Sequence, residues 1–268
     1  MMPACAAWSQ VKTAVPAGEP TNAEEAAAKK AAEAEELDRK FSAWKAGLLP
    51  RQQAWETVLE ANLGNFYLPL YKKDKVKTPP VPTAWDFLED DPKLPRVLLI
   101  GDSVSRGYTL ATRAALQGKM NVHRAPENCG PTANALKKLD IWLGEGKWDV
   151  IHFNFGIHDR ATPLADYLAR LEQIVERLKK TGAKIVWASS TPIPPDTKDG
   201  PQAAAAILEK NAAAQELMTK LGVAVNDLGG FITPHLARVQ NPKDVHFTND
   251  GYNLLGGQVA ASLLQQLP

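Results

Sequence analysis

The chain has 268 residues, of which 44% are hydrophobic and 23% charged, a composition typical of a globular protein with one large domain, or one domain with an extension. The 31 lysine and arginine residues nearly balance the 30 aspartate and glutamate residues, which argues against nucleic acid or an anionic membrane surface as a partner. Charged residues interrupt every apolar run before the roughly 18 residues that a membrane helix needs, so no membrane span is expected.

The N-terminal end leaves the cellular location open. Residues 1–7 include small residues that resemble a signal-peptide cleavage region, but the basic and apolar segments of a leader are lacking. A trimmed leader would place the protein in the periplasm or outside the cell, and otherwise a cytoplasmic location is expected. The two cysteines, Cys5 and Cys129, are too few and too far apart for a disulfide framework or a zinc site, so they do not decide the compartment.

The first third of the chain predicts a helical extension. Residues 1–22 contain three prolines and a glycine with little apolar pattern, which predicts a flexible lead-in. An apolar stripe at helical spacing then predicts a helix over residues 23–48, and a second stripe predicts a helix over residues 55–63 that packs against it as a hairpin. The Pro-rich residues 65–95 are expected to run extended, so that residues 23–94 form one extension.

Beyond residue 95, short apolar strands alternate with amphipathic helices. The predicted strands are residues 96–100, 121–124, 149–155, 184–189 and 223–228. The predicted helices are residues 108–117, 164–178, 207–221 and 252–267. This alternation predicts a parallel sheet with helices on both faces, formed by residues 95–268.

Ligands of an open parallel sheet bind beyond the carboxyl ends of its strands, so functional residues are expected in the loops that follow them. Gly101-Asp102-Ser103 follows the first predicted strand as a tight turn that opens a helix, with Asp102 as a turn-stabilising residue. The other loops of this edge, including the segment before the last helix, carry the remaining candidates: Asn128, Gly130, His158, Asp159, Asp244 and His246. Thr248 is expected to cap the last helix.

These residue types are the ones that acyl transfer needs. The hydroxyl of Ser103 becomes a nucleophile when His246 takes its proton, and Asp244 is the candidate that holds the imidazole in the required tautomer. The amides of Ser103 and Gly130, with a side chain from the third loop, are candidate donors to the oxyanion of a tetrahedral intermediate. No metal and no cofactor is expected, and the other histidines (His123, His152 and His235) are expected to be structural.

The motifs resemble those of the SGNH hydrolase superfamily, the GDSL-type esterases, over about residues 94–267. The resemblance implies a flavodoxin-like three-layer α/β/α sandwich with a central parallel sheet, here preceded by an α-helical N-terminal extension. In the family the third motif is Gly-x-Asn-Asp, whose asparagine donates to the oxyanion, whereas this chain has His158 at that place. His158 is therefore expected to donate in its stead, with Asn154 as the alternative.

A second departure concerns the triad acid. In the family the acid lies three residues before the histidine, where this chain has Lys243. Asp244 must therefore reach His246 along a different loop path, or a carbonyl group must orient the imidazole in its place.

The resemblance implies a serine esterase that acts on short-chain, acetyl-type esters through an acyl-enzyme, with carbohydrate O-acetyl esters as the leading substrates. A thioesterase or lysophospholipase, or a non-catalytic glycan-binding protein with a decayed site, are the alternatives. Candidate substrate contacts flank the motif loops: Arg106, Tyr108, Arg124, Asn128 and Arg160. Aromatic residues of the extension are expected to form core contacts, with a sugar-stacking platform as the alternative: Trp44, Trp55, Tyr67, Tyr71 and Trp85. The oligomeric state stays open.

Overall fold

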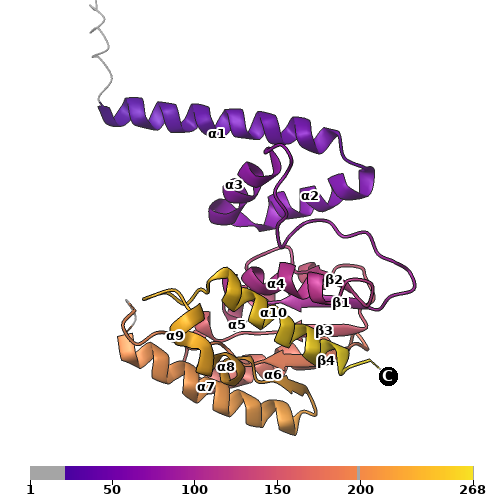
Figure 1. Cartoon of the computed structure of the whole chain (residues 1–268), viewed down its shortest axis with the longest axis vertical. Helices are drawn as coiled ribbons and strands as arrows, with labels where there is room; N and C mark the ends of the chain where they lie inside the picture. Colours follow the sequence, from indigo (N-terminus) through magenta and orange to yellow (C-terminus); the bar gives the residue numbers. More distant parts are fainter. Residues whose placement is uncertain (1–21, 198–199, 268) are drawn as a thin grey trace, which may run out of the picture.

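The computed structural model describes residues 22–197 and 200–267, which form a helical part and a larger α/β part (Figure 1). Within these ranges no helix is both long enough and apolar enough to cross a bilayer. The predicted lead-in of residues 1–22 lies, apart from Asn22, outside the described residues. We call residues 22–94 the N-terminal module and residues 95–267 the α/β domain.

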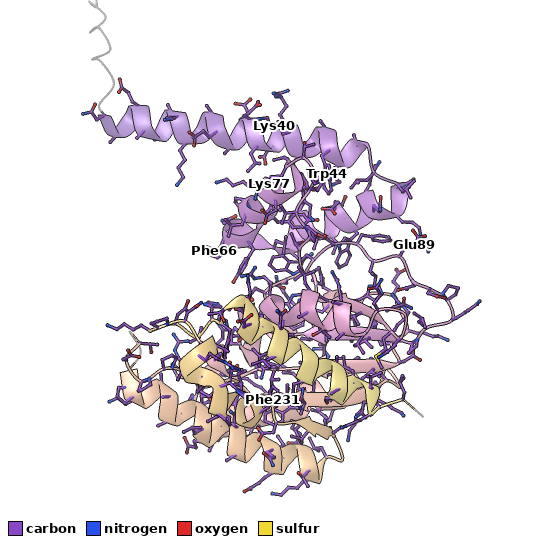
Figure 2. The ribbon with its side chains drawn as sticks, in the orientation of Figure 1. Lys40, Trp44, Phe66, Lys77, Glu89 and Phe231 are labelled. Atoms are coloured by element: carbon purple, nitrogen blue, oxygen red, sulfur yellow. The ribbon has the colours of Figure 1, made fainter. Side chains whose placement is uncertain are left out.

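The N-terminal module contains three helices, α1 (Asn22–Ala46), α2 (Pro50–Asn62) and α3 (Gly64–Lys75). They enclose a small hydrophobic core of Phe41, Leu59, Leu63, Tyr71 and Trp85. Trp44 lies on the side of α1 that faces the other two helices (Figure 2), and Trp55 and Tyr67 also pack against this core. The expected core contacts of the aromatic residues are therefore confirmed.

The extended conformation expected from residue 65 onward is wrong over α3. Pro69 lies inside this helix, where it removes an amide donor and costs helix stability. Tyr71, one half-turn later, is buried in the core of the module, and this burial offsets the cost. An extended, irregular segment runs on from residue 76 to the first strand, and it carries Trp85 into the core of the module.

The α/β domain has a sheet of five parallel strands in the order β2-β1-β3-β4-β5. In chain order the strands are β1 (Arg96–Ile100), β2 (Asn121–Arg124), β3 (Val150–Phe153), β4 (Lys184–Ala188) and β5 (Ala224–Asn226). All five were predicted, with ends within two residues. β1 lies between β2 and β3, so the loop after β1 leaves the sheet next to the point where the strand order reverses, which is where such sheets bind ligands.

Helices cover both faces of the sheet (Figure 1). Successive residues of β1 point to opposite faces: Val97 and Leu99 join one core, and Leu98 and Ile100 join the other. The first core is covered by α4 (Ser103–Ala115), α8 (Leu228–Ile232) and α10 (Asn249–Leu264). The second is covered by α5 (Thr132–Leu143) and α6 (Leu164–Lys179), while α7 (Gly200–Lys220) contributes to both. The predicted three-layer α/β/α architecture is confirmed.

Several helices differ from the prediction. α4 begins at Ser103, five residues before the predicted helix, because the Asp102 side chain accepts hydrogen bonds from the Val104 and Ser105 amides and so caps it. The expected turn-stabilising role of Asp102 is thereby confirmed, as is the cap of α10 by Thr248. α5 was not predicted, nor were the short helices α8 and α9 (Leu236–Val239) and the 3₁₀ turns η1 (Ile157–Asp159) and η2 (Thr233–His235).

Helices α4 and α10 pack closely because glycine lies at two of their contacts. A Cβ atom on Gly256 of α10 would lie 2.5 Å from the Cβ of Ala111 and 2.9 Å from the Thr112 amide nitrogen of α4. A Cβ atom on Gly107 would overlap the ring of Tyr252. This packing holds the first residue of α4 close to the segment that precedes α10.

His152 of β3 is fully buried, and burial lowers its pKa to about 4. Its Nε2 accepts from Asn226 Nδ2 at 3.2 Å, and Asn226 Oδ1 in turn accepts from Gln258. The neutral imidazole is therefore part of the fold, as expected for a structural histidine.

We expect the pH dependence of stability to report this burial. Between pH 6.5 and 4 the unfolded chain binds a proton at residue 152 that the folded chain does not bind, so the free energy of unfolding falls as pH falls. Relative to His152→Gln, which has no titrating group there, the wild type should lose about 3 kcal/mol more between pH 7.5 and 4. Urea titrations at several pH values measure this difference, and parallel curves for the two proteins would contradict it.

Candidate active site

The loops after the strands bring a serine, a histidine and an aspartate into one chain of hydrogen bonds. Ser103 Oγ lies 2.8 Å from His246 Nε2, and His246 Nδ1 lies 2.7 Å from Asp244 Oδ1. Ser103 is the first residue of α4, and His246 lies three residues before α10. In this geometry Nδ1–H donates to the carboxylate, which leaves Nε2 free to accept the serine proton.

Asp244 is held by His246 through two atoms. Its Oδ1 also accepts the His246 backbone amide at 3.2 Å. Partial burial alone would raise the pKa of Asp244, but the hydrogen bonds from the side chain and backbone of His246 outweigh this and hold the pKa below its ordinary value. The carboxylate is therefore ionised at neutral pH, as the imidazole requires.

The loop before His246 explains how an aspartate only two residues away reaches the ring. Asn241 donates its amide to the His246 carbonyl at 3.0 Å and accepts the Asp244 amide at 3.2 Å, which closes a tight loop. Lys243 has φ of +56°, in the left-handed region that non-glycine residues rarely adopt. This conformation turns the chain at the place where the family has its acid, and Asp244 takes up the contact with Nδ1.

Gly130 lies in the loop between β2 and α5 with φ of +66°, a conformation that favours glycine. The same loop is tied to the turn formed by residues 101–103, which we call the serine turn, because the Cys129 amide donates to the Gly101 carbonyl at 3.2 Å. The amides of Ser103 and Gly130 thus belong to two adjoining loops at one edge of the sheet. Asn128 is half-buried beside them, and its Oδ1 has no hydrogen-bond partner within residues 22–197 and 200–267.

His158 lies in η1 with its side chain exposed, between buried Ile157 and buried Asp159. Asp159 accepts hydrogen bonds from the amide of Thr132 at 2.8 Å and from its hydroxyl at 2.7 Å. Thr132 is the first residue of α5, so this clamp joins the loop of His158 to the loop of Gly130. Sequence reasoning missed the clamp because α5 itself was not predicted.

The expectation that Asn154 is an alternative oxyanion donor is wrong. Its amide nitrogen donates to the Ala188 carbonyl at 2.7 Å and to Ser190 Oγ at 3.1 Å. Both amide hydrogens therefore point to the end of β4. The side chain lies between neighbouring strand ends and secures them.

The candidate substrate contacts fall into two groups. Arg106 and Arg160 are half-buried, and Arg160 Nη1 donates to the Ile157 carbonyl at 3.0 Å. Tyr108 and Arg124, by contrast, are only 1% and 2% exposed, so neither side chain lies at the surface. Tyr108 belongs to the hydrophobic core, which corrects its expected role as a substrate contact. Helical spacing alone did not distinguish Tyr108, on the inner face of α4, from Arg106.

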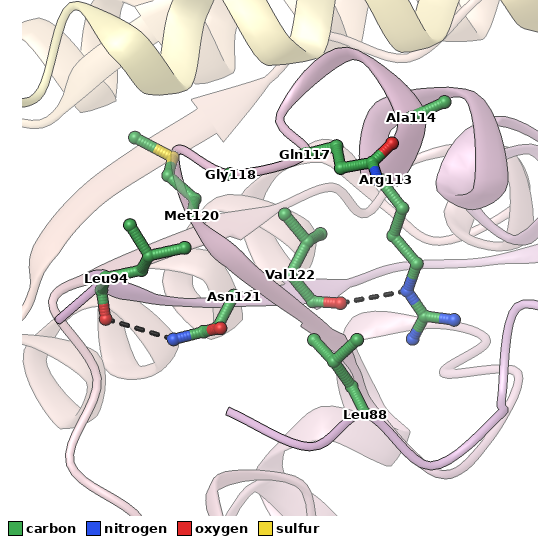
Figure 3. Close-up of a pocket in the computed structure, with 9 residues that line it drawn as sticks. All are labelled: Leu88, Leu94, Arg113, Ala114, Gln117, Gly118, Met120, Asn121 and Val122. Carbon is green, nitrogen blue, oxygen red and sulfur yellow. Dashed lines mark hydrogen bonds between the residues drawn. The ribbon is translucent and has the colours of Figure 1, made fainter. Parts of the chain in front are cut away.

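No metal site accompanies this arrangement: the described residues contain no group of three or more His, Cys, Asp or Glu side chains that could hold an ion. A cavity of about 340 Å³ lies between the segment that precedes β1, α4 and β2 (Figure 3). Its lining includes Leu88, Arg113 and Asn121 but none of the three residues of the hydrogen-bond chain. This cavity is therefore separate from the Ser103–His246–Asp244 chain, which lies in the loops at the carboxyl edge of the sheet.

Comparison with known proteins identifies the family of this chain. Residues 99–254 match the family model of the GDSL-like lipase/acylhydrolase family. Solved structures with the same fold include a lipase/acylhydrolase from Enterococcus faecalis, which is 20% identical with a TM-score of 0.59 and aligns over 65% of this chain and 97% of that one. The acetyl xylan esterase AlAXEase is 12% identical with a TM-score of 0.56, over 63% of this chain and 99% of that one.

A third structure is Axe2, an acetylxylan esterase from Geobacillus stearothermophilus, which is 15% identical with a TM-score of 0.53, over 64% of this chain and 93% of that one. No curated protein sequence matches this chain significantly. The family match covers the segment from β1 into α10, and so includes the serine turn and His246. The chain belongs to the GDSL-like lipase/acylhydrolase family and is a carboxylic ester hydrolase.

Proposed function

We propose that this esterase hydrolyses short-chain, acetyl-type esters of carbohydrates through an acyl-enzyme on Ser103. The observation that carries the proposal is the chain of hydrogen bonds from Ser103 through His246 to Asp244, with contacts of 2.8 and 2.7 Å. A serine hydroxyl is a weak nucleophile until a base takes its proton, and this chain supplies the base in the required tautomer.

The reaction proceeds in two halves. Ser103 Oγ attacks the ester carbonyl while His246 Nε2 takes its proton, and the same nitrogen then gives that proton to the departing alcohol. Asp244 stabilises the imidazolium that forms between the two transfers. A water molecule, activated by His246, hydrolyses the acyl-enzyme and releases the carboxylic acid. Nucleophile and base are both side chains, so these steps use no cofactor.

The oxyanion of each tetrahedral intermediate needs preorganised donors. We assign this role to the amides of Ser103 and Gly130 and to the ring of His158. A neutral imidazole has one N–H to donate. The clamp between Asp159 and Thr132 supports the assignment, because it holds the residue next to His158 against the loop of Gly130.

Substitution of His158 tests the third donor. His158→Ala should lower kcat by about 10² or more, because an oxyanion donor is lost, whereas His158→Asn should keep most of the activity because the amide also donates. Steady-state hydrolysis of p-nitrophenyl acetate measures both. His235→Ala is the control, since it changes a histidine outside the candidate loops. Equal rates for wild type and His158→Ala would exclude the donor role.

The carbohydrate part of the proposal rests on two observations. Two of the structures with this fold are named as acetyl xylan esterases. In this chain Arg106, Asn128 and Arg160 offer polar groups beside the motif loops, and we assign them to the sugar hydroxyls.

The test compares acyl length and alcohol. Wild-type protein with a chelator present should hydrolyse p-nitrophenyl acetate faster than the butyrate and much faster than the octanoate, and should release acetate from acetylated xylo-oligosaccharides. A rate that rises with chain length would favour a lysophospholipase, and preference for an acetyl thioester would favour a thioesterase. Either result contradicts the proposed substrate class while leaving the nucleophile in place.

A further inference from the structure

Arg124, at the end of β2, is an arginine buried behind the serine turn. Its side chain is 2% exposed, and among the described residues no carboxylate lies within ion-pair distance of it. Burial lowers the pKa of Arg124, yet an arginine keeps its charge at neutral pH because its ordinary pKa is so high. A buried charge is costly, and the surrounding dipoles, with the negative charge of Asp102 beyond ion-pair distance, must therefore compensate it.

The dipoles that do so belong to the serine turn. Nη2 of Arg124 donates to the carbonyl oxygens of Gly101 at 3.0 Å and Asp102 at 2.9 Å, and Nη1 donates to Ser105 Oγ at 2.5 Å. The planar guanidinium spans the turn in a way that a single ammonium group could not.

The Asp102 carbonyl receives more than this one bond. Ser105 Oγ donates to it at 3.0 Å, and the Arg106 amide donates to it at 3.0 Å as the first turn of α4 forms. Three donors thus converge on one oxygen. The peptide group that carries this oxygen also carries the amide N–H of Ser103, which the proposed mechanism uses as an oxyanion donor.

The amide N–H and the carbonyl oxygen of one peptide group are electronically coupled. Donors on the oxygen draw electron density away from the nitrogen, so the N–H becomes a stronger donor. A positive charge among those donors enlarges the effect, particularly in a buried place where water does not screen it.

The N-terminal module closes the other side of Arg124. The ring of Trp85 lies 5.9 Å from the Arg124 guanidinium and 5.8 Å from that of Arg106, and Tyr67 lies 5.3 Å from Arg106. Aromatic faces attract guanidinium groups and exclude water from them. Trp85 is itself 4% exposed in the core of the module, so its position depends on that module.

From these contacts we infer that Arg124 is a positioning residue, which holds the serine turn and polarises the Ser103 amide toward the oxyanion. In this inference the ring of Trp85, from the N-terminal module, excludes water from the Arg124 guanidinium. The inference rests on the proposed function, since it assigns a role within that site. It gives the N-terminal module a part in catalysis, although the module contributes none of the three residues of the hydrogen-bond chain.

The test uses the full chain and separates kcat from KM. Arg124→Met keeps the length of the side chain and removes the charge and the donors. We expect kcat for p-nitrophenyl acetate to fall about 10- to 100-fold while KM changes less than about threefold, because only the charged transition state uses the polarised amide. Affinity for n-butylboronic acid, which forms a tetrahedral adduct with serine, should fall by the same factor as kcat. Arg124→Lys should recover part of both.

Ser105→Ala is the second variant, because it removes one donor to the Asp102 carbonyl with little change in volume. Its kcat should fall about two- to fivefold in the same direction. Arg113→Met is the matched control: Arg113 also donates to backbone carbonyls, Val122 at 2.9 Å (Figure 3) and Thr83 at 3.3 Å, but within residues 22–197 and 200–267 none of its hydrogen bonds reaches the serine turn. Its kcat should stay within about twofold.

Titration of the serine with diethyl p-nitrophenyl phosphate gives the fraction of competent sites in each protein. A loss of kcat that only follows a loss of titratable serine and of melting temperature would reduce Arg124 to a structural residue and overturn the inference. Equal kcat in folded Arg124→Met and wild type would overturn it as well. Wild-type protein that neither hydrolyses esters nor reacts with the phosphate ester would instead contradict the proposed function, and the role of Arg124 with it.

Discussion

Replacing Ser103 by alanine is expected to lower kcat for p-nitrophenyl acetate by at least about 10⁴-fold, to the background rate. The Ser103 hydroxyl, 2.8 Å from His246 Nε2, is the group that forms the acyl-enzyme, and alanine has no nucleophilic atom in its place. Ser103 is largely buried, but the substitution removes only one oxygen atom and leaves the backbone unchanged. The melting temperature should therefore stay within a few degrees of the wild type.

The experiment needs a matched serine and a second readout. Ser262→Ala changes another buried serine, in α10, and should retain full activity. Incubation with diethyl p-nitrophenyl phosphate should add one diethylphosphoryl group to the wild type and to Ser262→Ala but none to Ser103→Ala, as measured by mass spectrometry of the intact protein. Labelling of Ser103→Ala at another residue, with activity retained, would mean that the nucleophile has been misassigned.

Asp244→Asn is expected to have the next largest effect, a loss of about 10³-fold in kcat with KM little changed. The carboxylate accepts Nδ1–H of His246 at 2.7 Å, and an amide nitrogen in its place favours the wrong tautomer, in which Nε2 carries the proton and cannot accept one. Because Asp244 is 45% exposed at its side chain, water can replace part of its role, and the loss should be smaller than for Ser103→Ala.

The pH profile distinguishes this role from a purely structural one. Hydrogen bonds from His246 outweigh the effect of burial and hold the pKa of Asp244 below its ordinary value, so the carboxylate stays charged over the neutral and alkaline pH range. Asp244→Asn should therefore lower kcat over this whole range. Asp250→Asn, which changes an exposed aspartate in the first turn of α10, should behave as wild type. If Asp244→Asn kept more than about a tenth of the activity, a backbone carbonyl would be the better candidate for orienting the ring.

The strands and the residues of the hydrogen-bond chain could be predicted because short segments of the sequence contain the information that identifies them. Short apolar segments alternating with amphipathic helices predicted all five strands, and the order of the motif loops placed Ser103 and His246 at one edge of the sheet. Those inferences needed only the rule that parallel strands end at the same edge. Even the unusual spacing of Asp244 was evident, although the loop path was not, because it depends on the left-handed conformation of Lys243.

Errors arose where contacts between distant residues decide the outcome. α3 was expected to be extended because residues 65–95 are rich in proline, but the helix forms around Pro69 because Tyr71 is buried in the core of the N-terminal module. Asn154 was a candidate donor by its place in the chain, yet Ala188 and Ser190, more than thirty residues later, take both of its amide hydrogens. A pattern read along the chain contains no information on which of several partners a polar group will meet.

The sequence by itself determined the class of this protein: an α/β domain with the motifs of GDSL-type esterases, a serine and a histidine at the carboxyl edge of its sheet, and Asp244 as the candidate for the third residue. Periodicity and motif order carry that information because each strand is recognised from its own apolar residues, and each functional loop from its position directly after a strand. Only the tertiary structure decided which arginine is buried, where Asp159 and Arg124 direct their hydrogen bonds, and how the N-terminal module meets the serine turn. Those properties depend on packing between segments far apart in the chain. The burial of a residue and the choice of its hydrogen-bond partner are fixed only when these segments pack together.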